Sequence, residues 1–456
     1  MKNKLPNIVF IVIDALRADH LSCYGYYRKT SPNIDKLAKE GILFENVFTS
    51  SHGTDASITS IFSGKYPLSH GIIGHGNEVT PEQMREFNET GTLLLPEILK
   101  SLGYITIGID WLGRWHKRGY DYYMGIKLKK SKIKRLLFYF LRKTQNMPIT
   151  ENAEYITSLS LKIIKKLKNS IKPFFLFIHY WDTHTPYRPP KRFENKFKER
   201  PARGVKIEEI LEKIKNPLYR EYMKTVTKGC DYVSDVVAKY DGAIAYVDSQ
   251  IGRIMNFLEE ENNLFKNTMV IITADHGESL GEHEIYFAHH ELYDEVLRIP
   301  LIMNYYFQLP KETRIKSLVQ NIDIAPTIFE MLKVDYSKFC LDGISLLSLL
   351  KKGCEVRSKI FAIDTLLEGK RTIRTENWKY IFTPFKDMRI CRVCGYSHGE
   401  TEELYDLKSD PKEQYNIAFK EEALTKKLRE ELFELEKSLK TKKEIQKRAQ
   451  GNINCE

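Results

Sequence analysis

The stretch Asn7-Ile8-Val9-Phe10-Ile11-Val12-Ile13-Asp14 (residues 7–14) predicts a buried β-strand that ends in a carboxylate. Its apolar, mostly β-branched side chains continue without alternation, which is typical of a strand covered on both faces of a parallel sheet. Similar short runs occur at residues 104–109, 174–179, 269–273 and 301–305, with helix-like stretches between several of them. The sequence therefore predicts an α/β protein with a mostly parallel central sheet flanked by helices.

The pattern changes near residue 351. Short strand-like runs follow at residues 359–363 and 379–382, and a charged, helix-compatible stretch covers residues 421–449. We expect residues 1–350 to form the main α/β domain and residues 351–456 to form a small C-terminal α+β subdomain.

Composition limits the class of protein. The chain has 456 residues, of which 42% are hydrophobic and 29% charged, as in folded globular proteins rather than disordered or fibrous ones. The longest apolar runs are far too short for a membrane span. Seven scattered cysteines do not form a dense disulfide framework, so we expect a cytoplasmic protein.

The net charge of +11, from 71 Lys and Arg against 60 Asp and Glu, favours an anionic partner. Residues 127–143 (KLKKSKIKRLLFYFLRK) are basic around an apolar centre, a pattern compatible with either peripheral membrane contact or a solvated charged face. Nucleic acid is an unlikely partner on this evidence, because no recognised binding fold or aromatic platform accompanies the charge.

Polar clusters follow the predicted strands, where ligands bind in open α/β sheets. Asp14 ends the first strand, and Asp275-His276 ends the run at 269–273. An adjacent carboxylate and imidazole are ligands that Zn²⁺ or Mn²⁺ accepts. Thr54 precedes a helix-compatible run, where a hydroxyl is either a cap or a nucleophile. Further loop-like clusters contain Asp182, His184 and His289.

Taken together, these segments resemble the sulfatase branch of the alkaline phosphatase superfamily over nearly the whole chain. The matching motifs, in order, are Asn7-Ile8-Val9 leading to Asp14, Thr30-Ser31-Pro32-Asn33-Ile34-Asp35, Gly41-Ile42-Leu43-Phe44, Phe62-Ser63-Gly64-Lys65-Tyr66-Pro67, His184-Thr185-Pro186-Tyr187, Asp275-His276-Gly277-Glu278, Arg298-Ile299-Pro300-Leu301, Glu403-Leu404-Tyr405-Asp406-Leu407 and Asp410-Pro411. The resemblance implies an alkaline phosphatase-like fold and a metal-dependent enzyme that acts on ester bonds.

The chain departs from the sulfatase pattern at the nucleophile. Sulfatases carry a Cys or Ser, later converted to formylglycine, in a Cys/Ser-x-Pro-x-Arg motif ten residues before the Gly that corresponds to Gly64. Here Thr54, Ala56 and Ile58 occupy the three motif positions. Ala15 and His276 also replace an acid and an Asn that sulfatases use for Ca²⁺. Fewer carboxylates and an added imidazole favour Zn²⁺ or Mn²⁺ over Ca²⁺.

These departures match superfamily members that use an unmodified Thr. The resemblance then implies that Thr54 is the nucleophile and that Asp14, Thr54, Asp275 and His276 hold one divalent metal. Three further residues would bind a second metal or the substrate phosphate: Asp182, His184 and His289.

The leading prediction is a phosphoric ester hydrolase or phosphotransferase with an anionic ester substrate. One alternative is a sulfuric ester hydrolase that works without formylglycine. Another is a noncatalytic anion-binding member of the family.

Other histidines and cysteines fit supporting roles. His179, His283 and His290 are expected to be structural or to support the metal ligands. Cys391 and Cys394, with His398, could belong to a zinc site, but four ligands are needed and no fourth is evident in the sequence nearby. The alternative is a pair of free thiols in an inserted loop.

Overall fold

A central sheet organises the molecule. The computed structural model describes residues 5–125, 152–351, 354–365, 369–391 and 394–453, and the basic stretch 127–143 lies outside them. Within the described residues the sheet has eight strands in the order β10-β2-β9-β6-β1-β5-β3-β4. Their bounds are β1 Asn7–Ile13, β2 Ile42–Phe48, β3 Ile105–Ile109, β4 Tyr122–Met124, β5 Phe174–Tyr180, β6 Thr268–Thr273, β9 Arg298–Asn304 and β10 Thr313–Gln320.

Strand direction confirms the predicted mostly parallel sheet. β9 runs antiparallel to β2 and β6, and the other neighbouring strands are parallel. In the centre, Val12 of β1 is paired with His179 of β5 on one side and Thr273 of β6 on the other. This register brings the carboxyl ends of the three strands, and the polar residues near them, to one edge of the sheet.

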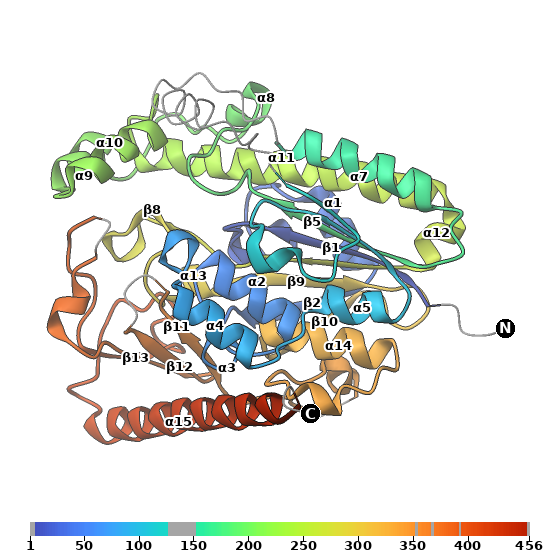
Figure 1. The fold of residues 1–456 in the computed structure, drawn as a ribbon. Helices are drawn as coiled ribbons and strands as arrows, with labels where there is room; N and C mark the ends of the chain where they lie inside the picture. The colour runs from blue at the N-terminus through green and yellow to red at the C-terminus, as the bar shows by residue number, and fades with distance from the viewer. Residues whose placement is uncertain (1–4, 126–151, 352–353, 366–368, 392–393, 454–456) are drawn as a thin grey trace, which may run out of the picture.

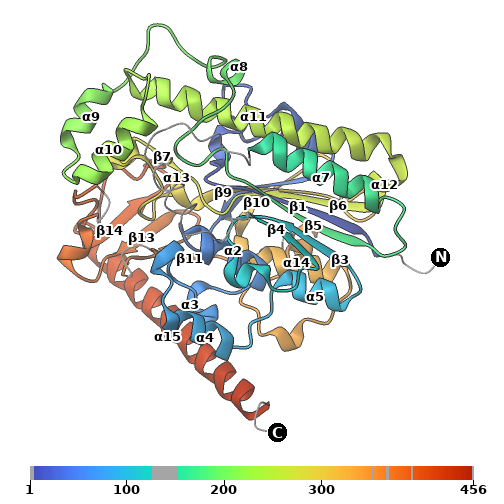
Figure 2. The same cartoon turned by 45° about the horizontal axis from the view of Figure 1, so that its top comes forward.

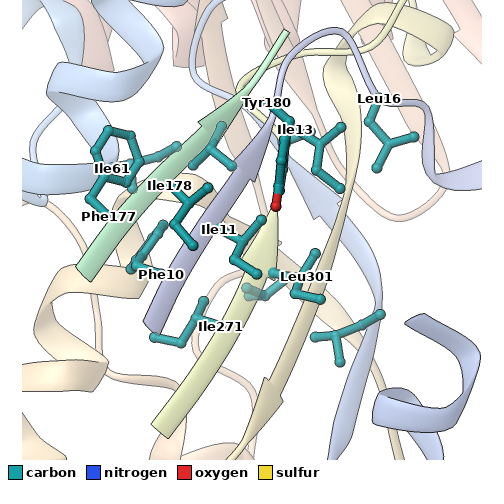
Figure 3. Close-up of a cluster of buried hydrophobic side chains, with 14 of the residues drawn as sticks. Phe10, Ile11, Ile13, Leu16, Ile61, Phe177, Ile178, Tyr180, Ile271 and Leu301 are labelled. Atoms are coloured by element: carbon teal, nitrogen blue, oxygen red, sulfur yellow. The ribbon is translucent and has the colours of Figure 1, made fainter. Parts of the chain in front are cut away.

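The core explains the unbroken apolar run at the start of the chain. Every residue of β1 is buried, and Figure 3 shows its side chains packed among those of β5, β6 and β9. The Phe62 ring lies 5.5 Å from the Phe10 ring and 4.9 Å from the Phe177 ring, both in edge-on arrangements. Each such buried aromatic ring contributes about 1.5–3 kcal/mol by removing apolar surface from water, so β1 and α2 (Thr54–Ser63) are held in a fixed relative position.

Helices cover both faces of the sheet (Figures 1 and 2). Four of them pack together on one face: α1 Pro32–Lys39, α7 Ala153–Leu167, α11 Val233–Glu260 and α12 Asn262–Lys266. The opposite face carries α2, α5 (Leu95–Ser101) and α14 (Ile324–Met331). Other α-helices of the described residues are α3 Pro67–His70, α4 Pro81–Glu89, α8 Lys191–Glu194, α9 Ile207–Lys213, α10 Pro217–Val226 and α13 Asp294–Leu297. No helix of the described ranges is long and apolar enough to cross a membrane.

A second, antiparallel sheet confirms the predicted small C-terminal α+β unit. It has the order β11-β12-β13-β14 in the part of the chain that the structure describes, with bounds Ile360–Ile363, Arg371–Arg374, Trp378–Phe382 and Glu402–Asp406. The long helix α15 (Glu422–Ile453) packs against β12, β13 and α3. The expected domain boundary at residue 350 stays a prediction.

Buried ion pairs join the two sheets. Asp294 of α13 contacts Arg374 at 3.0 Å and Lys379 at 2.9 Å, and Lys379 also contacts Glu413 at 2.7 Å. Lys379 is completely buried. A buried cation without its partners would cost several kcal/mol, so this network ties the C-terminal sheet to the loop that leads into β9.

Candidate active site

The described structure brings together the side chains that follow β1 and β6. Asp14 continues β1, and Asp275 and His276 continue β6, while His179 is the penultimate residue of β5. All four residues are completely buried. Because β1 lies between β5 and β6, these side chains meet at the carboxyl edge of the sheet.

Two carboxylates form the base of the cluster. The backbone turns sharply after Asp14, since Ala15 has a φ of 54°, and the Ala15 N–H donates to Asp275 Oδ1 at 3.2 Å. A left-handed conformation at a non-glycine residue is typical of strained functional sites. Burial raises the pKa of Asp14 well above its usual value, and the negative charges of Asp275 and Glu278 raise it further. Two buried carboxylates in this position favour binding of a cation.

Two imidazoles present their Nε2 atoms to the carboxylates. His276 Nε2 lies 3.3 Å from Asp275 Oδ2 and 3.7 Å from Asp14 Oδ1, and its Nδ1 is 2.8 Å from the Gly277 carbonyl oxygen. His179 Nε2 lies 3.7 Å from Asp14 Oδ2, with Nδ1 2.8 Å from Asp110 Oδ1. Nδ1–H donation to an oxygen leaves the Nε2 lone pair free, the usual arrangement of a metal-binding histidine.

Within the described part of the chain, several buried polar atoms of this cluster lack hydrogen-bond partners, which bears on whether a metal fits there. Both carboxylate oxygens of Asp14, Asp275 Oδ2 and His179 Nε2 are buried and have no hydrogen-bond partner among the described residues. Donor atoms of Asp14, His179 and Asp275 lie within 4.8 Å of one another. Buried polar atoms without partners are costly. A divalent cation among these oxygen and nitrogen donors would satisfy all of them, so the residues present fit such an ion.

Thr54 is the first residue of α2 and faces the same cluster. Its Oγ1 lies 3.4 Å from His276 Nε2, and the residue is 1% exposed. Gly53 precedes the helix and supplies no side-chain cap, and in the first turn the Asp55 N–H is directed at His75 Nδ1 at 3.4 Å. The free backbone N–H groups and the helix dipole at such an end attract anions. The hydroxyl predicted as nucleophile therefore lies between the metal donors and a favourable anion position.

His289 and His184 line the same site. The His289 ring stacks on the His276 ring with centroids 4.2 Å apart, and it lies 5.1 Å from the His184 ring. Burial lowers the pKa of His276 to about 4 and also lowers the pKa values of His184 and His289. At neutral pH these rings are uncharged, the form that can accept a metal ion or a hydrogen bond.

Asp182 has different contacts. Its Oδ1 accepts a hydrogen bond from the Ala153 N–H at the start of α7, with an N to O distance of 3.2 Å. Burial raises the pKa of Asp182 to about 6. These contacts support a role in positioning α7, and its role as a ligand of a second metal stays a prediction.

The structure adds residues beside Thr54 that the sequence pattern did not indicate. Asp55 is buried and accepts from three cationic or imidazole side chains, with 3.1 Å to His75 Nδ1, 3.1 Å to His116 Nε2 and a close ion pair with Arg114. His75 and Arg114 are partly exposed at the edge of the site. Burial lowers the pKa of His184, and the nearby His75 lowers it further. In the sequence, only the net charge of +11 indicated positively charged side chains at the site.

The chain matches two protein-family models. The family model described as "Sulfatase" matches residues 6–334. The chain belongs to the sulfatase family. A second model, "N-sulphoglucosamine sulphohydrolase, C-terminal", matches residues 281–438 of this sulfatase-family hydrolase. Both matches confirm the predicted sulfatase-like branch of the alkaline phosphatase superfamily.

Curated relatives cover most of this sulfatase-family protein. It is 25% identical to an N-acetylglucosamine-6-O-sulfatase of Bacteroides thetaiotaomicron, over 97% of this chain and 88% of the relative. It is 26% identical to an arylsulfatase of Clostridium perfringens, over 91% of each chain. A solved protein in complex with its substrate D-glucosamine-2-N,6-O-disulfate has a TM-score of 0.69 and 24% identity, covering 97% of this chain and 98% of the other, which supports the fold.

These relatives correct the functional prediction. The expectation of a phosphoric ester hydrolase or phosphotransferase is wrong, because the similar curated proteins are named as sulfatases. The physical reason for the error is that sulfate and phosphate esters present similar tetrahedral anions. The absence of the Cys/Ser-x-Pro-x-Arg residues around Thr54 did not distinguish the two substrate classes. The alternative of a sulfuric ester hydrolase agrees better with the relatives.

Proposed function

We propose that this protein hydrolyses sulfate monoesters, converting RO–SO₃⁻ and water to ROH and HSO₄⁻. One observation carries the proposal. The Thr54 hydroxyl lies at the N-terminus of α2 and 3.4 Å from His276 Nε2, beside the unpartnered carboxylate oxygens of Asp14 and the unpartnered Oδ2 of Asp275. Membership of the sulfatase family supports the sulfate ester as the substrate class.

Asp14, Thr54, Asp275 and His276 would hold a divalent metal, and the geometry adds His179 to this set. Two carboxylates combined with two imidazoles favour Zn²⁺ or Mn²⁺, because Ca²⁺ prefers a shell of oxygen donors. When bound, the cation supplies positive charge that stabilises anionic oxygens during ester cleavage. Asp110 orients His179 for this role through its 2.8 Å contact with Nδ1.

Thr54 acts as an unmodified alcohol in this proposal. Its Oγ1 forms a bond to sulfur while the ester S–O bond breaks, the hydroxyl proton leaves to solvent, and the departing alcohol takes up a proton. Water then attacks the same sulfur, releases hydrogen sulfate and restores the hydroxyl. The N-terminal end of α2, which has no side-chain cap from Gly53, favours negative charge on the sulfate oxygens through the helix dipole.

The surrounding side chains suit an anionic sugar ester. Neutral His289 can donate one hydrogen bond to a sulfate oxygen, whereas the N–H of neutral His184 is directed at the Thr185 carbonyl oxygen at 2.8 Å. Arg114 and His75 stand at the edge of the site. A sulfated amino sugar is the substrate class that the relatives suggest, since one is named for N-acetylglucosamine-6-O-sulfate ester cleavage and another was solved with a disulfated glucosamine.

The test is sulfate release from p-nitrophenyl sulfate and N-acetylglucosamine-6-sulfate by protein supplied with Zn²⁺ or Mn²⁺, with p-nitrophenyl phosphate as the comparison. We expect sulfate release, and we expect Thr54→Ala to lower kcat by at least about 10³-fold while Thr54→Ser retains activity. Turnover of the phosphate ester alone would overturn the proposal. Folded, metal-loaded protein that releases sulfate from no ester would instead indicate a noncatalytic anion-binding protein. Full activity of Thr54→Ala would refute the nucleophile assignment.

A further inference from the structure

A second group of metal-binding side chains lies in the C-terminal part of the chain. Donor atoms of Cys391, Cys394 and His398 lie within 4.8 Å of one another, and Cys394 Sγ is 3.0 Å from His398 Nε2. Cys391 and His398 are buried. Two thiols and an imidazole are the ligands that Zn²⁺ prefers in structural sites, where it takes four ligands in a tetrahedron.

The local backbone brings the two thiols together. The chain folds back so that the Gly395 N–H donates to the Cys391 carbonyl oxygen at 2.8 Å, and Gly395 adopts a φ of +79° that favours glycine. The Tyr396 N–H donates to Cys394 Sγ at 3.4 Å. An N–H group directed at sulfur stabilises the thiolate, which is the form that binds metal. This turn therefore places the two sulfurs close together, with an N–H group directed at the Cys394 sulfur.

The missing fourth ligand comes from another part of the chain. Both ring nitrogens of His290 are buried and have no hydrogen-bond partner among the described residues. His290 lines the same cavity of about 50 Å³ as Cys394 and His398. A buried imidazole with two unpaired nitrogens is unfavourable. His290 lies outside the group of three within 4.8 Å, so its ring must turn toward the sulfurs when the ion binds.

We propose that Cys391, Cys394, His398 and His290 bind a structural Zn²⁺ that is separate from the catalytic metal. Binding releases the protons of both thiols and gives a closed site of two sulfur and two nitrogen ligands. The site does not depend on which ester the enzyme cleaves.

Such an ion would fasten three segments to one another. The Cys394 carbonyl oxygen accepts from the Lys215 and Asn216 N–H groups, just before α10, so the cysteine loop already contacts the helical segment of residues 207–226. His290 follows His289 directly, and His289 stacks on His276 in the active site. The zinc would therefore fix the backbone beside His289 and limit its movement relative to the catalytic cluster. In this proposal His290 is a positioning residue.

The experiment measures metal content and uses a catalytic-site variant to separate the two ions. In Asp14→Asn/Asp275→Asn protein, we expect about one Zn²⁺ per chain to survive extensive dialysis. The further change Cys394→Ser should remove it, and His290→Ala should accelerate its transfer to a chelator. Cys354→Ser is the matched control, because Cys354 is exposed and outside the cluster; it should leave the zinc in place.

Two further measurements need no additional variant. Titration of the Asp14→Asn/Asp275→Asn protein with a thiol-binding mercurial should release the zinc as the thiols react. Replacement of the zinc by Co²⁺ should give a thiolate-to-cobalt charge-transfer band. The proposal would be overturned if the protein is isolated without zinc and binds none when zinc is supplied. A disulfide between Cys391 and Cys394 in place of bound zinc would also overturn it. Zinc that stays bound after both thiols are blocked would also overturn it.

Discussion

Replacing Gly53 with Ala should disturb the nucleophile without changing any polar group. Gly53 has φ −96° and ψ 129°, a conformation open to alanine, so the backbone itself accepts the change. A Cβ atom built there would lie 2.3 Å from Thr365 Oγ1, 3.0 Å from its Cβ and 3.1 Å from its Cγ2. Thr365 is 1% exposed, so its side chain cannot move out into solvent without a shift of its surroundings. The start of α2 or the segment that carries Thr365 must therefore move.

The size of the effect follows from this overlap. Forcing one additional carbon into a packed core costs about 1–3 kcal/mol. A displacement of about 1 Å at a reacting group lowers the rate about 100-fold. Because Thr54 is next to Gly53, we expect the Gly53→Ala protein to lose about 2 kcal/mol of unfolding free energy and about 100-fold in kcat, with a smaller change in KM.

The assay pairs urea unfolding with sulfate release for four proteins: wild type, Gly53→Ala, Thr365→Gly and the double variant. Thr365→Gly removes all three overlapping atoms, so the double variant should recover much of the activity that Gly53→Ala loses. The single Thr365→Gly protein measures the cost of the deletion itself. If Gly53→Ala matches wild type, or if the double variant is no more active than Gly53→Ala, the steric argument is refuted.

Three further predictions concern acidic side chains, two near the candidate site and one in the ion pairs between the sheets. Asp110→Asn should weaken metal affinity about 10- to 100-fold, because Asp110 orients His179. If titration of the metal-free variant with the metal gives an unchanged affinity, His179 is not a ligand. Asp182→Asn should keep near-normal metal content and kcat, since an amide oxygen can still accept the hydrogen bond at the start of α7, whereas a collapse of activity would place Asp182 on a second metal. Burial alone would raise the pKa of Asp294, but its two cationic partners hold that pKa below the usual value of 3.8, so its stabilisation is present above that value and is lost as pH falls. Wild-type protein should therefore lose more thermal stability than Asp294→Asn between about pH 5 and pH 3, and equal losses would contradict this.

The strands of the sheet interior could be predicted from sequence. β1, β5 and β6 are buried on both faces and read as continuous apolar runs. β10 was not predicted, because an edge strand alternates exposed and buried positions and contains Lys316. In β2, Glu45 and Asn46 interrupt the apolar run, so this strand does not stand out as a continuous apolar segment. The antiparallel direction of β9 depends on pairings between distant segments, which a local pattern does not contain.

Some residues of the candidate site could be predicted from sequence, and others could not. Asp14, Thr54, Asp275 and His276 could be predicted because each begins a loop or helix directly after an apolar strand or a recognisable motif. His179 lies within a strand, where a buried histidine looks like a core residue. Its significance depends on Asp14 across the sheet and on the Asp110 contact, and both are properties of the folded chain.

The fourth zinc ligand proposed above shows the same limit. His290 lies more than 100 positions before the cysteine pair in the sequence. Its unpartnered ring nitrogens become visible only when the fold places it in the same cavity as Cys394 and His398. Sequence spacing identifies ligands that are close along the chain, but it cannot identify one that arrives from another layer of the molecule.

The central position of β1 has a consequence for how each molecule is made. The hydrogen bond from Ala15 to Asp275 joins residues 260 positions apart, and a ribosome needs about 10 to 50 s to synthesise that interval. During this time the apolar, fully buried strand β1 has emerged while its partner β6 does not yet exist. The nascent chain thus exposes an aggregation-prone segment early, and the buried carboxylate pair of Asp14 and Asp275 forms only after more than half of the polypeptide has been translated.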